Sequence, residues 1–81
     1  MNGHGDMSQL VREMRGRIGL SQEKFAAKIG VSFPTVSRWE KGRAKPSPLA
    51  MQKIEESLRK MGKNGQDLLH EYFPEDHGAE E

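Results

Sequence analysis

Glycine interrupts this chain at short intervals. Gly19, Gly30, Gly42 and Gly62 each follow a stretch in which apolar residues recur at steps of three or four. That step is the period of an amphipathic helix, and glycine readily adopts the left-handed backbone conformation that ends one. No stretch of the sequence shows the alternation of apolar and polar residues that is typical of a strand. The glycine spacing therefore predicts an all-α fold of four to five helices.

Serine marks where most of the predicted helices begin. An N-cap side chain accepts a hydrogen bond from a backbone N–H that the first helical turn leaves free, and serine and aspartate are favoured there. Pro48 follows one such serine at the first helical position, where its missing N–H removes no hydrogen bond. Pro34 likewise falls in a first turn and does not break its helix. In chain order, the expected caps are Asp6 or Ser8, Ser21, Ser32 and Ser47.

One side of each predicted helix carries the apolar residues that should form the core. Only 33% of the 81 residues are apolar, so a single small domain with a compact core is expected. The expected core residues are Leu10, Val11, Met14 and Ile18, then Phe25, Ala26 and Ile29, then Val31, Val36 and Trp39, and finally Leu49, Met51, Ile54, Leu58 and Met61.

Charge is divided unevenly along the chain. Residues 1–62 contain 12 Lys/Arg and 6 Asp/Glu, whereas residues 63–81 contain one lysine and six acids, so +6 and −5 sum to the net +1. A basic body suits a polyanionic partner, and an acidic tail is most simply a solvating segment. We expect disorder at residues 1–6 and 74–81, a domain at 7–62, and an acidic tail at 63–81. That tail should contain a short helix at 66–73 after a flexible GKNG break at 62–65.

The chain lacks the residues that several functional classes need. The chain has no cysteine, and its three histidines, His4, His70 and His77, do not share a helix face at a ligand spacing. We therefore predict no metal, no cofactor and no catalytic site. No apolar run approaches the roughly 18 residues of a membrane span, and the N-terminus shows no hydrophobic signal segment. The expected location is the cytoplasm, with nucleoid association if the chain is bacterial.

Two of the predicted helices are only two to three turns long. They fall at 21–29 and 32–41 and are joined by the tight turn Gly30-Val31. Two short helices joined in this way are typical of a helix-turn-helix, in which the second helix enters the DNA major groove.

The segment GLSQEKFAAKIGVSFPTVSRWEKGRAKPSPLAMQKI resembles the lambda-repressor-like helix-turn-helix family, also called the Cro-repressor or XRE family. The matching features are Leu20-Ser21-Gln22, Phe25-Ala26, Ile29-Gly30-Val31-Ser32, the run VSRWEKG at 36–42, and Pro46-Ser47-Pro48-Leu49. The resemblance covers about residues 8–61. It implies a compact four- to five-helix DNA-binding domain that regulates transcription, usually as a homodimer on a nearly palindromic double-stranded site.

The resemblance also implies roles for individual residues. It places a recognition helix at 32–41, with Arg38 suited to guanine O6 and N7, a contact worth about 1–3 kcal/mol of discrimination. The ring of Phe33 could contact thymine methyl groups. The implied base-reading residues are Ser32, Phe33, Pro34, Ser37 and Arg38. The implied phosphate-binding residues are Gln22, Thr35, Lys41, Arg43 and Lys45.

Arg15 and Glu40 occupy positions at which the family often has a structural ion pair. Breaking one partner of a well-buried pair costs about 3–5 kcal/mol, whereas two exposed charges would contribute almost nothing. The resemblance therefore implies an ion pair between Arg15 and Glu40. How deeply the pair is buried determines how much it contributes to the stability of the fold.

Two other classes of protein remain open at this point. Small domains of this family are often antitoxins, and the tail DLLHEYFPEDHGAEE could bind a basic protein partner. Alternatively its apolar residues, Leu68, Leu69, Tyr72 and Phe73, pack on the domain or form a dimer interface. A protein-interaction adaptor of the same fold is the other class, because Phe33 and Pro34 replace polar residues that repressors often use to read bases.

Overall fold

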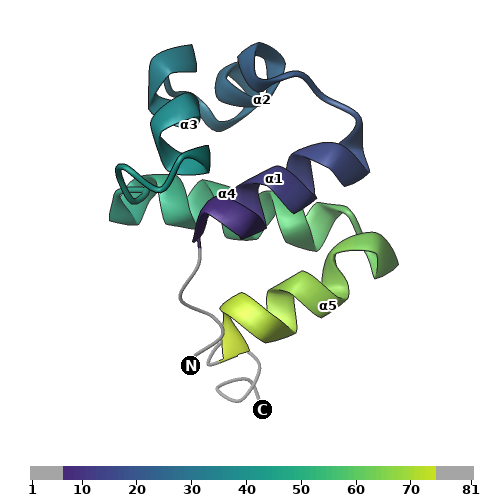
Figure 1. Ribbon diagram of the computed structural model, residues 1–81. Helices are drawn as coiled ribbons and strands as arrows, with labels where there is room; N and C mark the ends of the chain where they lie inside the picture. The colour runs from purple at the N-terminus through teal and green to yellow at the C-terminus, as the bar shows by residue number, and fades with distance from the viewer. Residues whose placement is uncertain (1–6, 75–81) are drawn as a thin grey trace.

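The computed structural model describes residues 7–74 of the chain, and these residues form five helices and no strand. The helices are α1 (Met7–Ile18), α2 (Gln22–Ile29), α3 (Phe33–Glu40), α4 (Pro48–Lys60) and α5 (Lys63–Tyr72). In Figure 1, α2 and α3 lie together at one end, α1 and α4 occupy the middle, and α5 lies at the other end. The predicted all-α fold is confirmed. The predictions for residues 1–6 and 75–81, which include His4 and His77, lie outside the described residues.

Helices α2, α3 and α4 begin directly after the predicted serine caps, whereas Ser8, one of the two residues expected to cap the first helix, lies inside α1. The side chain of Ser21 accepts a hydrogen bond from the backbone N–H of Lys24 at 3.1 Å. Ser32 accepts one from Thr35, and Ser47 accepts one from Ala50 at 3.2 Å. Each bond satisfies a backbone donor that the first turn of the helix leaves free. The three caps therefore fix where α2, α3 and α4 start.

All five helices contribute to one hydrophobic core. Phe25, Leu10 and Met14 are completely buried, and Trp39 is nearly so. The remaining buried apolar residues are Val11, Ala26, Ile29, Val36, Ala50, Ile54, Leu58, Leu68 and Leu69. The expected core residues that are only partly buried are Ile18, Val31, Met51 and Met61. Because α2 and α3 have only 8 residues each, this shared core is what stabilises them.

The prediction that Leu49 belongs to the core is wrong. Its side chain is 64% exposed, although it directly follows the first residue of α4. The face of α4 that meets the core is instead set by Ala50, Ile54, Ser57 and Leu58. Successive residues of a helix point about 100° apart, so a helix that buries Ala50 turns its neighbour Leu49 toward solvent.

The prediction of a flexible break at residues 62–65 is also wrong. Helix α5 begins at Lys63, three residues earlier than expected, after Gly62 has turned the chain in a positive-φ conformation (φ 64°). Gly65 is buried, and a Cβ atom added to it would lie 2.5 Å from the carbonyl oxygen of Leu58. The small glycine thus lets the start of α5 pack directly on the end of α4.

Helix α5 packs on the rest of the domain instead of forming a separate tail. Leu68 and Leu69 are buried in the shared core. Of the two arrangements expected for the apolar residues of this segment, these two residues therefore follow the one in which they pack on the domain. Arg17 of α1 donates to the carbonyl oxygen of Asn64 at 2.7 Å and to both carboxylate oxygens of Asp67 at 2.7 and 3.0 Å. The hydrogen bond from Arg17 lowers the pKa of Asp67 below its usual value.

The described helices are also too short or too polar to span a membrane. Within residues 7–74, no helix combines the length and the apolar character that crossing a membrane requires.

The two helical glycines Gly65 and Gly16 give a matched test of this packing. We expect Gly65→Ala to destabilise the fold by about 1–3 kcal/mol, because its new methyl group collides with backbone atoms of α4. Gly16 lies in α1 with no atom near its added Cβ, so Gly16→Ala should stabilise by about 0.5–1 kcal/mol. Thermal unfolding measures both changes, at about 4–8 °C per kcal/mol for a domain of this size. An unchanged or higher Tm for Gly65→Ala would contradict the close approach of α5 to α4.

Candidate nucleic-acid interface

A tight turn holds α2 and α3 in a fixed relationship. Gly30 adopts a left-handed conformation with φ 90°, and the backbone N–H groups of Gly30 and Val31 both donate to the carbonyl oxygen of Ala26, at 2.8 and 2.9 Å. Ser32 follows at once as the cap of α3. Phe25 and Val36, on either side of this turn, are both buried, so the two helices pack into the same core.

The outward side of α3 carries the residues that were expected to read bases. Val36 and Trp39 face the core, so the opposite side of this short helix faces solvent. Phe33 is 49% exposed, and Pro34 and Arg38 are also exposed. Four residues of the predicted base-reading set therefore lie on α3. Ser37 is half-buried, and Phe33, Pro34 and Arg38 are exposed.

The side chains of Ser32 and Thr35 form a hydrogen bond with each other. The hydroxyl oxygens of the two side chains lie 2.8 Å apart, and the same Ser32 oxygen accepts the backbone N–H of Thr35 at 3.3 Å. This double contact closes the first turn of α3. Ser32 therefore serves as a helix cap, and only one hydroxyl proton of the pair is left for an outside partner.

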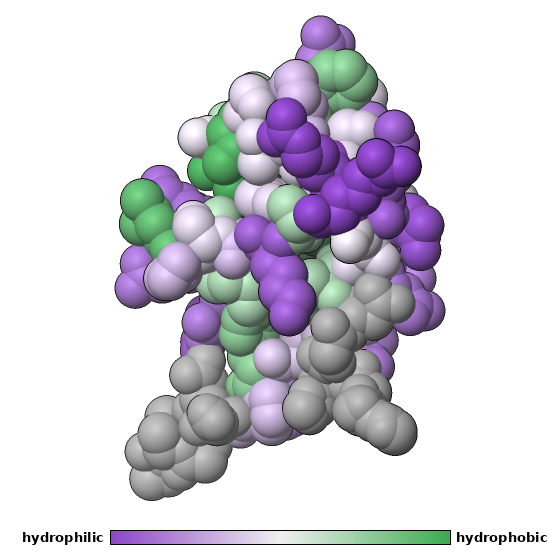
Figure 2. All heavy atoms as spheres, turned by 60° about the vertical axis from the view of Figure 1, so that its left-hand side comes forward, coloured by the Kyte–Doolittle hydropathy of each residue, from purple (hydrophilic) through white to green (hydrophobic). Residues whose placement is uncertain are grey.

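The loop after α3 concentrates unpaired positive charge. Lys41, Arg43 and Lys45 fall within five residues that contain no acid, and all three are exposed. Within residues 7–74, neither these side chains nor that of Arg38 forms a hydrogen bond or an ion pair. Figure 2 brings this side of the molecule forward and shows strongly hydrophilic residues gathered on its upper part, with smaller apolar patches between them. The solvent-facing side of α3 is therefore flanked by uncompensated cations.

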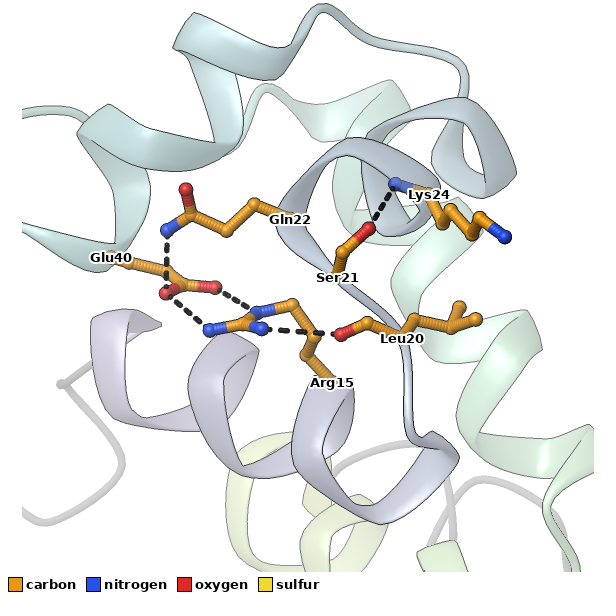
Figure 3. A network of polar contacts seen from close by, with 6 residues as sticks. All are labelled: Arg15, Leu20, Ser21, Gln22, Lys24 and Glu40. Atoms are coloured by element: carbon orange, nitrogen blue, oxygen red, sulfur yellow. Dashed lines mark hydrogen bonds and ion pairs between the residues drawn. The ribbon is translucent and has the colours of Figure 1, made fainter.

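A polar network joins α1, α2 and α3 (Figure 3). Arg15 of α1 donates through Nε to Glu40 Oε2 at 2.7 Å and through Nη2 to Glu40 Oε1 at 3.1 Å. Its third nitrogen, Nη1, donates to the carbonyl oxygen of Leu20 at 3.1 Å. Gln22 of α2 donates through Nε2 to Glu40 Oε1 at 2.9 Å. One carboxylate at the end of α3 thus accepts three hydrogen bonds from two other helices.

The charge state of Glu40 depends on this network. Its side chain is 6% exposed, and that burial alone would raise the pKa of the carboxyl group. Hydrogen bonds from Arg15 and Gln22, with the positive charges of Arg15 and Arg12, outweigh burial and bring the pKa below its usual value. The hydrogen bond to Glu40 in turn raises the pKa of Arg15. Glu40 is therefore an anion at neutral pH.

Sequence reasoning missed the contact between Gln22 and Glu40. The resemblance pointed to Gln22 as a phosphate ligand and to Glu40 as the partner of Arg15, and the structure places all three side chains in one cluster. The two residues lie on different helices with a turn between them, so no helical period relates them. They meet only because the turn after α2 brings the end of α3 beside the start of α2.

Among the described residues, no three or more histidine, cysteine or acidic side chains are grouped as a metal ion would need.

Comparisons with known proteins show which family the chain resembles. Residues 11–60 match the family model described as helix-turn-helix (HTH). An uncharacterized HTH-type transcriptional regulator of Methanothermobacter thermautotrophicus is 40% identical over 52 residues, which are 64% of this chain and 75% of that protein. The uncharacterized HTH-type transcriptional regulator YgzD of Bacillus subtilis is 46% identical over 48 residues, 59% of this chain and 73% of that protein. No solved structure matches the chain with significance.

We predict that Glu40→Gln destabilises the domain by about 1–3 kcal/mol, because Arg15 keeps its burial but loses its charged partner. The value lies below that of a fully buried pair because the Arg15 side chain is 26% exposed. Thermal unfolding at neutral pH measures this change, and an unchanged Tm would contradict the role of the pair.

The same variant has an expected pH profile. Since the pKa of Glu40 is below its usual 4.5 in the folded state, the stability that this group contributes is present above about pH 4.5 and is lost as the pH falls further. The difference in Tm between wild type and Glu40→Gln should therefore shrink in acid.

Proposed function

The chain belongs to the helix-turn-helix family of DNA-binding transcriptional regulators, and we propose that it binds specific sequences as an XRE-type regulator whose helix α3 enters the major groove. The observation that carries the proposal is the exposed side of α3, flanked by cations that no described residue neutralises. A polyanion is the partner that such a surface fits, and a helix of this width fits the major groove of B-DNA.

Sequence preference comes from two exposed residues of α3. Arg38 presents a planar set of donors that matches the O6 and N7 acceptors of guanine. Phe33, near the start of the helix, presents an apolar ring that suits a thymine methyl group. Both residues belong to α3 and both are exposed, so both side chains are free to reach base edges.

Phosphate contacts set the position of the domain on the duplex. The loop cations Lys41, Arg43 and Lys45 lie at one end of α3, while Gln22 lies at the start of α2, where backbone N–H groups and the helix dipole favour an anion. Thr35 supplies a further hydroxyl beside the first turn of α3. These groups surround the α3 surface and would hold it in the groove.

The protein acts as a homodimer on two half-sites. Family members usually bind nearly palindromic DNA, and two recognition helices then lie one helical turn apart, roughly 34–36 Å. The antitoxin alternative finds less support, because Leu68 and Leu69 of the acidic segment are already buried in the domain itself.

Selection of bound duplexes from a random pool tests the proposal directly. We expect enrichment of a motif with two related half-sites. An unenriched pool, together with an affinity that does not depend on salt, would overturn the DNA-binding function and favour an adaptor.

We predict different outcomes for two neighbouring cations. Lys41→Ala should weaken binding to all duplexes alike and reduce the log–log salt slope by about 0.9, because it removes one phosphate contact. Arg38→Ala should instead relax the preference at one position of the motif by about 1–3 kcal/mol. Lys60→Ala, at the far end of α4, is the control and should change neither quantity. Equal losses on all duplexes for Arg38→Ala and Lys41→Ala would contradict the division of roles.

Phe33→Ala tests the apolar contact to thymine. We expect its selected motif to lose a thymine preference at one position, with a loss of about 0.8 kcal/mol per buried methyl-sized group on the wild-type site. The measurement is a second selection carried out with the variant. A motif identical to that of the wild type would show that Phe33 does not read the base.

A further inference from the structure

Glu40 links two places where the DNA backbone would be held. It is the last residue of α3, and Lys41, the first cation of the loop, follows it directly. Its carboxylate accepts a hydrogen bond from Nε2 of Gln22, the first residue of α2, at 2.9 Å. The side chain that should meet a phosphate at the start of α2 is therefore anchored at the end of α3.

The chemistry of a carboxylate determines how the Gln22 amide is turned. An ionised carboxylate only accepts hydrogen bonds, so it binds the amide nitrogen, and the reverse orientation would place two oxygens against each other. Figure 3 shows the amide nitrogen of Gln22 facing Glu40 and its oxygen pointing away. The nitrogen keeps a second N–H, which a phosphate oxygen can accept.

Arg15 in turn holds the carboxylate in place. Its guanidinium binds both oxygens of Glu40 and also the carbonyl oxygen of Leu20, two residues before Gln22. The same group thus fixes the backbone that leads into α2 and the acceptor that orients the Gln22 side chain. A glutamine on a free surface would have several rotamers, whereas this one is restricted before any DNA arrives.

We propose that Glu40 is a positioning residue for DNA binding, which acts through Gln22 by holding its amide ready for a phosphate at a fixed distance from Lys41. This inference rests on the proposed function. It assigns Glu40 a role in affinity that is separate from its role in the ion pair with Arg15, and it predicts that the two roles can be separated by measurement.

A double-mutant cycle tests the proposal. Gln22→Ala, Glu40→Gln and the double variant are titrated against a fluorescently labelled duplex recovered by selection, at a temperature where thermal unfolding shows each to be folded. Each single change should lower affinity about 3- to 10-fold. The double variant should bind within about 2-fold of Gln22→Ala alone, because Glu40 has no further route to the phosphate. The salt slope should stay unchanged, since the contact is neutral.

Two controls separate positioning from charge and from stability. Glu13→Gln makes the same charge change on α1, away from Gln22, and should not lower affinity. Ile54→Val destabilises the core without touching the network and should also leave affinity unchanged. If Glu40→Gln does not fold, Glu40→Asp replaces it in the cycle, because it keeps the charge but draws the carboxylate back from Gln22.

The outcomes are distinguishable. Losses that multiply in the double variant, to roughly 10- to 100-fold, would overturn the proposal and leave Glu40 with a structural role only. Loss of affinity in Ile54→Val would overturn it as well, since stability would then explain the effect. If the wild-type protein binds neither the selected nor a random duplex, the proposed function fails and this inference fails with it.

Discussion

The ion pair between Arg15 and Glu40 is the interaction on which the rest of the proposed binding surface depends. It joins α1 to the end of α3, and its remaining hydrogen bonds reach the backbone before α2 and the side chain of Gln22. Helices of eight residues have little stability of their own, so their mutual placement must come from packing and from contacts of this kind. Arrangements that separate the buried carboxylate of Glu40 from Arg15 would leave a buried charge unpaired and would be less stable, so the pair favours one arrangement of the helices.

The hydrophobic core and this polar network together determine which side of α3 faces solvent. Phe25, Val36 and Trp39 turn the apolar side of the helix pair inward. The network closes the other edge of the pair, where α2 begins and α3 ends. What is left outward is a helix face with Arg38 and Phe33, beside a loop whose lysines and arginine have no partner among the described residues. Such a surface combines long-range attraction for a polyanion with a small set of groups that can distinguish bases.

Much of the fold could be predicted because local rules determine it. Ser21, Ser32 and Ser47 cap helices through bonds that span only three residues, and the period of the apolar residues gives the core faces. The errors lie where packing between helices decides. Leu49 continues an apolar pattern yet points outward, and Gly65 looks like a linker residue yet serves as a contact point for α4. The bond between Gln22 and Glu40 could not be predicted, since it depends on how two helix ends are juxtaposed.

The central claim is that the outward side of α3, with the start of α2 and the loop after α3, meets the DNA. Amide chemical-shift mapping during titration with a selected duplex measures this most directly. The account predicts that perturbed amides cluster at Ser21–Gln22, along Ser32–Arg38 and at residues 41–45, while α5 remains unchanged. Perturbations that centre on α5 and its contact with α1, with α2 and α3 unaffected, would contradict it.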